Sequence, residues 1–215
     1  MLQIVPAVLQ YEMSDFKREL LKLSLSSVLH VDIVKNFTNS KDSIEIATVL
    51  KMDEIKLFNE ICFHLMSNTF PAEEIEMIKN FTKQNPTRYF SVAISQDLLT
   101  VETLLLPENL RVVPVIENDN LFQIEFYDQF FELIIMTVEP GTQGRKFLKK
   151  RLNLVEELRS LGFNGEIALD GGINEKTITQ ILKVKINKLI VGSYFSKSED
   201  FKSAFNSLAD LVVDN

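Results

Sequence analysis

Cysteine, histidine and glycine are all scarce in this chain of 215 residues, and each shortage restricts what the protein can be. The single cysteine, Cys62, cannot form a disulfide within the chain, which suits a reducing compartment. No apolar run approaches the roughly 18 residues that span a membrane. The first residues also lack the basic start and long apolar stretch of a signal peptide. We therefore expect a cytoplasmic protein that does not associate with membranes.

Positive charge is also in short supply. The chain has 23 lysines and arginines against 30 aspartates and glutamates, a net charge of -7. Because nonspecific nucleic-acid binding needs a basic surface, we expect no nucleic-acid partner. Any phosphate site must rely on local donors rather than on a global positive field. Hydrophobic residues make up 46% of the chain, which is enough for one sizeable core, so we expect a single domain over residues 1–215.

Short apolar runs alternate with helical patterns along the whole chain. Strands are expected near residues 2–9, 27–33, 58–66, 88–94, 111–116, 131–137, 165–169 and 187–191. Helices are expected near residues 13–23, 43–51, 71–82, 97–106, 119–128, 147–161, 174–183 and 199–212. Eight strands alternating with eight helices indicate an α/β protein with a parallel sheet. At this length the pattern favours a closed (β/α)8 TIM barrel over a doubly wound open sheet.

One predicted helix is rich in aromatic residues. Phe122, Phe126 and Phe130 recur every four residues, which marks one face of a helix. Packing of this face against the barrel is the favoured interpretation, and a subunit interface is the alternative. The expected assembly is a homo-oligomer.

The only two histidines both lie in apolar runs that are typical of buried strands. Side chains alternate along a strand, so His30 and Asp32 share a face, and His64 lies on the matching face of the next strand. Asp170 ends a third apolar run. Buried imidazoles and carboxylates are costly unless something pairs with them. Taken singly, each histidine is more often a satisfied core residue. Together, at strand ends that face a barrel mouth, the four residues predict one divalent metal: zinc, ferrous iron or manganese.

Two carboxylates held across a metal suggest proton chemistry. A metal can polarise a ketone and stabilise the enediolate that forms when the adjacent carbon loses its proton. If Asp32 and Asp170 flank opposite faces of the substrate, one can remove the proton and the other can return it from the far side. The result would be inversion of a stereocentre.

The positions of the glycines predict an anion-binding site. All seven lie between positions 141 and 192, and most of them follow the last three predicted strands. Glycine turns expose backbone amides to a ligand, and barrels commonly bind phosphate near their last two loops. The alternative is that these glycines merely permit tight turns. The candidate phosphate-binding residues are Gly141, Gly144, Gly171, Gly172, Gly192 and Ser193, with Arg145 as a further charged donor or a solvated surface residue.

These residues resemble the ordered motifs of the ribulose-phosphate 3-epimerases across nearly the whole chain. The motifs are Pro6-Ala7-Val8-Leu9, His30-Val31-Asp32-Ile33, His64-Leu65-Met66, Met136-Thr137-Val138-Glu139-Pro140-Gly141, Asp170-Gly171-Gly172-Ile173 and Val191-Gly192-Ser193. The resemblance implies a (β/α)8 barrel that interconverts D-ribulose 5-phosphate and D-xylulose 5-phosphate in the pentose phosphate pathway. It implies metal ligation by the two histidines and two aspartates already named, with the two aspartates as the acid/base pair.

The resemblance also places Met66 and Met136 in the lining of the catalytic pocket, beside Ala7, which replaces the family's usual serine. Two further segments depart from the family pattern. Residues 34–36 replace its Met-Asp-Gly, and residues 141–145 read Gly-Thr-Gln-Gly-Arg in place of its Gly-Phe-Gly-Gly-Gln. A 3-epimerase of a hexulose 6-phosphate, such as allulose 6-phosphate, and a sugar-phosphate-binding barrel without turnover therefore stay open as alternatives. A phosphate-barrel decarboxylase is disfavoured, because its Asp-x-Lys pair is missing after Asp32.

Overall fold

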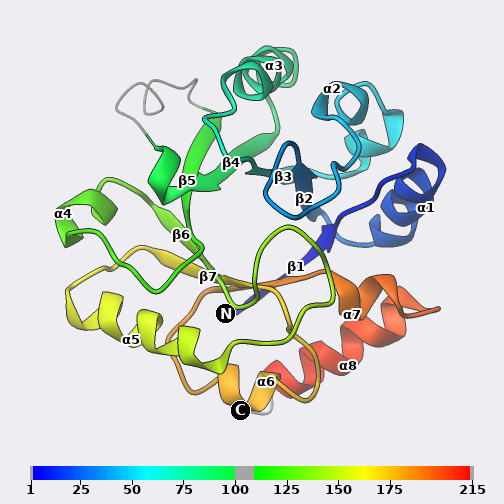
Figure 1. The fold of residues 1–215 in the computed structure, drawn as a ribbon. Coiled ribbons are helices and arrows are strands. Elements are labelled where there is room, and N and C mark those ends of the chain that lie inside the picture. Colours follow the sequence, from blue (N-terminus) through cyan, green and yellow to red (C-terminus); the bar gives the residue numbers. More distant parts are fainter. Residues whose placement is uncertain (1, 100–108, 214–215) are drawn as a thin grey trace.

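The computed structural model describes residues 2–99 and 109–213, and within them eight parallel strands close into a barrel. Each strand pairs with the next one along the chain, and the last strand pairs with the first to complete the closure (Figure 1). The predicted (β/α)8 TIM barrel is confirmed, and the alternative of an open doubly wound sheet is wrong.

The element bounds follow the predicted order. The strands are β1 Gln3–Val8, β2 Val28–Val34, β3 Glu60–Met66, β4 Tyr89–Ser95, β5 Leu110–Ile116, β6 Glu132–Met136, β7 Glu166–Asp170 and β8 Lys188–Val191. The helices are α1 Met13–Leu23, α2 Ile46–Val49, α3 Ala72–Lys83, α4 Ile124–Tyr127, α5 Leu152–Ser160, α6 Ile178–Ile181, α7 Ser193–Ser196 and α8 Phe201–Val213. Short 3-10 turns are η1 Asp53–Leu57, η2 Gln96–Leu98 and η4 Lys149–Arg151.

Three helices are much shorter than the sequence pattern predicts. Segments expected to be helical over 43–51, 119–128 and 174–183 form only the single turns α2, α4 and α6. In the second segment side chains take the place of helical bonds, because the Phe122 N–H donates to the Tyr127 hydroxyl. The short helix α7 was not expected. The helix predicted over 97–106 begins in η2, and its remainder lies outside the described residues.

The core has two layers. Small or branched side chains and one methionine fill the barrel interior: Val5, Ala7, Ala93, Val113, Val115, Ile134, Met136, Ala168 and Ile190. A larger layer lies between strands and helices, where α1 buries Phe16, Leu20 and Leu23 along one face. Burial of each such side chain stabilises the folded protein by roughly 1.5–3 kcal/mol. Phe126 and Phe130 also pack on this layer, with ring centroids 5.3 Å apart, whereas Phe122 is 37% exposed. Of the three, only Phe126 lies within α4.

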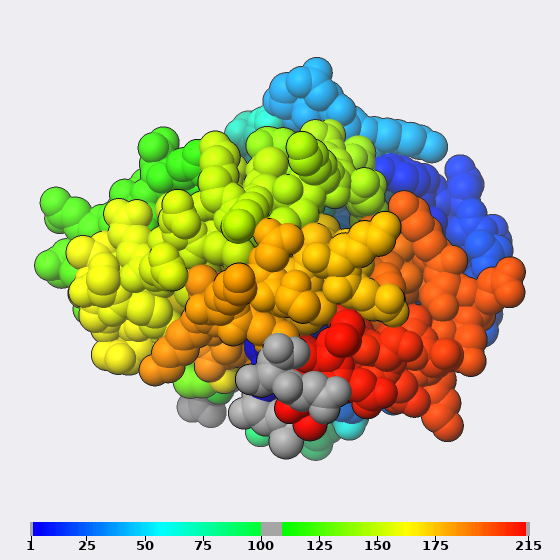
Figure 2. All heavy atoms as spheres, turned by 90° about the horizontal axis from the view of Figure 1, so that it is seen from below, coloured from blue at the N-terminus to red at the C-terminus, as the bar shows by residue number. Residues whose placement is uncertain are grey.

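Strand register places the predicted site residues at one level of the barrel. Asp32 is the register partner of His64, and His30 is the partner of Ala7. Met136 pairs with Asp170 at the end of β7. The loops that follow β2 and β6 lie over this end of the barrel, near the centre of the view in Figure 1. From the side, the yellow, orange and red segments α5 to α8 cover one flank of the barrel below the β6 loop (Figure 2).

In the ranges 2–99 and 109–213, no helix combines the length and apolar character needed to cross a membrane.

Candidate metal centre

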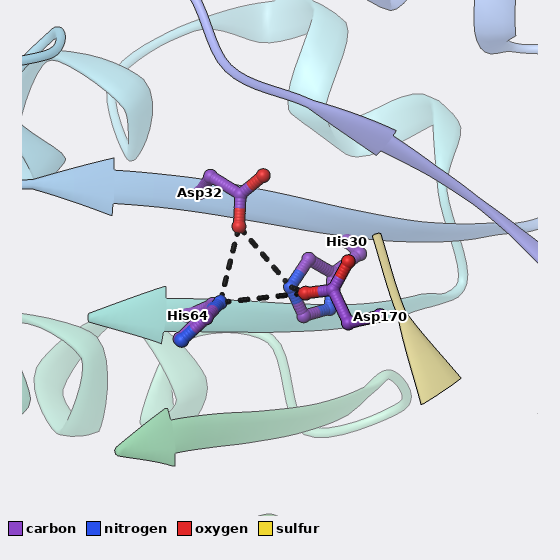
Figure 3. A group of neighbouring side chains, drawn as sticks. All are labelled: His30, Asp32, His64 and Asp170. Carbon is purple, nitrogen blue, oxygen red and sulfur yellow. Dashed lines mark hydrogen bonds and ion pairs between the residues drawn. The ribbon is translucent and has the colours of Figure 1, made fainter. Parts of the chain in front are cut away.

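Four side chains from three strands converge at the carboxyl end of the barrel. His30 and Asp32 come from β2, His64 comes from β3, and Asp170 is the last residue of β7 (Figure 3). All four are buried, and one candidate ligand atom from each lies within 4.8 Å of the others. Strand alternation and parallel register therefore bring together the four residues that the sequence singled out.

The distances within this cluster suit a shared cation. His64 Nδ1 lies 3.1 Å and His30 Nε2 lies 3.3 Å from Asp32 Oδ1. The same two nitrogens each lie 3.7 Å from Asp170 Oδ2. Ligands held about 2.0–2.2 Å from one ion are separated by about 3.0–4.4 Å, depending on the angle between them. The four observed separations fall inside that range, and all four candidate ligand atoms lie within 4.8 Å of one another, so the cluster is compact enough to hold one cation.

The imidazoles lack the partners of an ordinary core histidine. Within the described ranges, His30 Nε2 and His64 Nε2 are buried without a hydrogen-bond partner, while His64 Nδ1 and Asp32 Oδ1 are bonded to each other. A buried polar group without a partner costs about 1–3 kcal/mol. His30 is therefore not a core histidine with its hydrogen bonds satisfied. Ligation of a cation by His30 Nε2 would account for the missing hydrogen bond.

The electrostatics of the cluster favour a positive charge at its centre. Burial opposes ionisation of Asp32, but the nearby imidazoles of His30 and His64 outweigh it and hold the pKa of this carboxyl below its usual range. Burial, reinforced by the Asp32 carboxylate and opposed by the imidazoles, raises the pKa of Asp170 to about 6. Burial would lower the pKa of His30, yet Cys62 and Asp32 raise it well above its usual value. The metal-free cluster therefore holds a proton where a cation would supply the charge.

Thr137 positions Asp170, a role that the sequence pattern did not predict. Its buried hydroxyl donates to the Asp170 carbonyl at 3.0 Å and to the Gly171 carbonyl at 2.6 Å. Its backbone N–H also donates to the Asp170 carbonyl, at 2.7 Å. These bonds tie the end of β7 to the start of the β6 loop. The only sequence signal was its place inside the Met136–Gly141 motif.

A small cavity of about 40 Å³ opens beside the two carboxylates. It brings together most of the predicted pocket and phosphate residues: Ala7, Asp32, Met66, Met136, Gly141, Gly144, Asp170, Gly171, Gly172, Gly192 and Ser193. Arg145 is not part of this lining. Its side chain is exposed, and its Nε donates to the Thr142 hydroxyl at 2.8 Å.

Two polar side chains beside this cavity were not expected as ligand contacts. Gln143 lines it, and a Cβ added to Gly192 would lie 2.6 Å from Gln143 Nε2. A Cβ added to Gly144 would lie 3.4 Å from Lys197 Nζ, which places an ammonium group against the same loop. Lys197 follows α7, so its approach depends on a helix that the sequence pattern did not predict.

A larger cavity, of about 530 Å³, lies at the opposite end of the barrel. It is lined by the amino ends of β3 to β6 and by Lys188, which forms ion pairs with Glu132 at 2.6 Å and Glu166 at 3.1 Å. In (β/α)8 barrels the amino ends of the strands serve stability and the carboxyl ends carry the chemistry. We therefore place the candidate site at the smaller cavity, where the His/Asp cluster lies.

The closed barrel and the His/Asp cluster at its carboxyl end define a barrel enzyme with a candidate divalent-metal centre. The model of the ribulose-phosphate 3 epimerase family matches residues 3–196. The chain therefore belongs to the ribulose-phosphate 3-epimerase family, and it is an isomerase of the epimerase type.

Individual relatives agree at modest identity. A ribulose-phosphate 3-epimerase of Helicobacter pylori is 24% identical, over 98% of both chains. The enzyme of that name from Aquifex aeolicus is 27% identical, over 72% of this chain and 76% of its own. Among solved structures, a Mycobacterium tuberculosis tryptophan synthase covers 98% of this chain and 92% of its own, with a TM-score of 0.70 and 10% identity. That structural likeness shows the fold.

Proposed function

We propose that the protein interconverts D-ribulose 5-phosphate and D-xylulose 5-phosphate by moving the proton at C3, a step of the pentose phosphate pathway. Membership of the epimerase family supports the reaction type. The observation that carries the proposal is the pair of buried carboxylates, Asp32 and Asp170, which share one cluster and line one cavity. Inversion of a carbon centre by proton transfer needs an acid and a base together, and this pair supplies both.

His30, Asp32, His64 and Asp170 would hold one divalent cation, with zinc, ferrous iron and manganese all suited to two imidazoles and two carboxylates. When bound, the cation supplies positive charge that stabilises the oxyanion of the substrate's enediolate. The two imidazoles fix the position of this charge from β2 and β3. Thr137 fixes the backbone that carries Asp170.

The two carboxylates divide the proton transfer. Without a metal, burial raises the pKa of Asp170 to about 6, whereas the imidazoles hold the pKa of Asp32 below its usual range, so the two carboxylates have different environments. One aspartate removes the C3 proton from one face, and the other returns a proton to the opposite face. No net proton is consumed. Met66 and Met136 provide apolar walls that keep water from the exchanging carbon.

The phosphate end of the substrate would lie against the glycine loops. The amides around Gly144, Gly171, Gly172 and Gly192 and the hydroxyl of Ser193 provide local donors beside the cavity. Gly171 and Gly172 have φ values of 100° and 69°, and a side chain at either position would be strained. Lys197 adds positive charge next to Gly144. Arg145 would add charge at the rim, where it is held by Thr142.

Substrate entry requires the loops over the site to move. The cavity of about 40 Å³ is far smaller than the roughly 300 Å³ of a small-molecule site. Gly141 of the β6 loop lies against Ser40 of the β2 loop, where an added Cβ would come within 2.1 Å of the serine hydroxyl. The β6 loop, which lines the cavity, therefore packs against the β2 loop. Their separation would admit the sugar phosphate, and their closure would exclude water.

A second candidate is a 3-epimerase of a hexulose 6-phosphate, with the same chemistry. The observation that favours it is Ala7, which lines the cavity and replaces the hydroxyl of the family's usual serine. Residues 34–36, in the β2 loop, also differ from the family pattern. Comparison of kcat/KM on D-ribulose 5-phosphate and D-allulose 6-phosphate separates the two candidates. A barrel that binds sugar phosphate without turnover is disfavoured, because all four cluster residues are in place.

Proton NMR of D-ribulose 5-phosphate in D2O tests the proposal. The metal-loaded protein should exchange the C3 hydrogen for deuterium and produce D-xylulose 5-phosphate. After treatment with a chelator both processes should stop, and zinc or manganese should restore them. A metal-free protein with full activity would contradict the role given to His30 and His64.

A further inference from the structure

The side-chain amide nitrogen of Gln143 lies at the glycine-lined end of the cavity. This nitrogen, Nε2, is shielded from solvent, and in the part of the chain that the structure describes it has no hydrogen-bond acceptor. The group lies against Gly192, where an added Cβ would come 2.6 Å from Nε2 and 3.0 Å from Cδ. Because buried amide hydrogens are nearly always bonded, an open donor at the wall of a cavity indicates a missing acceptor.

The surroundings of this donor suit an anion. Gln143 shares the cavity lining with Gly144, Gly172, Gly192 and Ser193, whose backbone and hydroxyl groups are donors. The ammonium of Lys197, which follows α7, lies beside Gly144, and Gly144 belongs to the same loop as Gln143. The chain as a whole carries a charge of -7, so anion binding must come from such local groups.

We propose that Gln143 Nε2 donates a hydrogen bond to the phosphate group of the substrate, which makes Gln143 a substrate-positioning residue. The proposal deepens the function proposed above and rests on it for the identity of the sugar, but the phosphate contact can be tested alone. The family pattern has glycine at this position, so this donor is a property of this chain. The competing interpretation is that the carboxamide fills the phosphate position and blocks it.

Binding of inorganic phosphate to the metal-loaded protein separates these interpretations. Titration calorimetry would compare the parent with Gln143→Leu, which keeps the size of the side chain and removes the donor. Gln143→Glu would keep the shape and place a negative charge at the same point. Gln84→Leu makes the same exchange at an exposed position after α3, at the far end of the barrel, and serves as the matched control.

We expect Gln143→Leu to weaken phosphate binding by about tenfold to a hundredfold, the range for one hydrogen bond to a charged group. The loss should be larger for Gln143→Glu and absent for Gln84→Leu. The KM for D-ribulose 5-phosphate should rise with the phosphate Kd, while metal content stays at the parent value. Circular dichroism of all three variants checks that each is folded.

Phosphate binding by Gln143→Leu that equals or exceeds that of the parent would overturn the proposal and identify the side chain as a block. A parent protein that binds no phosphate would overturn it as well. If phosphate binding depends on Gln143 but D-ribulose 5-phosphate is not turned over, the phosphate contact stands and the proposed reaction fails.

Discussion

Replacement of Asp170 by asparagine should have opposite effects on activity and on the stability of the metal-free protein. The substitution preserves the shape of the side chain and removes its charge. Asp170 is buried at the end of β7, lies 3.7 Å from both imidazole nitrogens and shares the cluster with Asp32. As a proposed acid/base group it is needed for proton transfer, and as a buried carboxylate it is costly to ionise without a cation.

The magnitude follows from the pKa. Burial raises the pKa of Asp170 from its ordinary 3.8 to about 6, so the folded protein binds this proton more tightly than the unfolded chain. The stability from this proton is fully present below pH 3.8 and is lost as the pH rises through 6. At about 1.4 kcal/mol for each tenfold change in affinity, the loss at pH 8 is about 3 kcal/mol. Metal-free Asp170→Asn should therefore melt higher than the metal-free parent at pH 8, by roughly 6–12 °C.

The assay is thermal unfolding of both proteins in chelator at pH 4.5 and pH 8, followed by circular dichroism. The difference in Tm between Asp170→Asn and the parent should be large at pH 8 and small at pH 4.5. In parallel, the metal-loaded variant should convert D-ribulose 5-phosphate to D-xylulose 5-phosphate about 10²–10⁴-fold more slowly. Activity within tenfold of the parent would refute the acid/base assignment. A variant that is less stable than the parent at pH 8 would refute the electrostatic reasoning.

Two further predictions concern the cluster and the opposite end of the barrel. Metal ligands must be deprotonated, and the pKa values of Asp170 and His30 are raised in the metal-free protein. Zinc affinity should therefore fall by at least about tenfold for each pH unit below 6. Competition with a chromophoric chelator from pH 5 to 8 measures this, and a flat profile would contradict it. Lys188→Met should cost about 1–3 kcal/mol of unfolding free energy in urea, because it leaves Glu132 and Glu166 without their half-buried partner. Metal content should not change, and a stability loss below about 1 kcal/mol would show that the ion pairs are dispensable.

Much of the fold could be predicted because its strands are buried on both faces. Such strands appear in a sequence as short continuous apolar runs, and each strand lies within two residues of its predicted bounds. The four cluster residues could be found for the same reason. Strand alternation puts His30 and Asp32 on one face, and parallel pairing brings His64 alongside Asp32.

The rest depends on contacts that local patterns do not encode. The short helix α4 begins only after Phe122, whose N–H donates to the Tyr127 hydroxyl and not to a helical carbonyl. Lys197 reaches Gly144 from a segment about fifty residues further along the chain. The orientation of Gln143 toward Gly192 likewise depends on how the β6 and β8 loops meet. No spacing rule within the sequence predicts such approaches between loops.

Shared ligation of one cation by His30, Asp32, His64 and Asp170 is the central claim, and X-ray absorption at the zinc edge of zinc-reconstituted protein tests it most directly. We expect one zinc per chain, with two imidazole nitrogens and carboxylate oxygens at about 2.0–2.2 Å and no sulfur neighbour. A sulfur ligand from Cys62, or zinc that binds equally well after His64→Gln and Asp170→Asn, would contradict it.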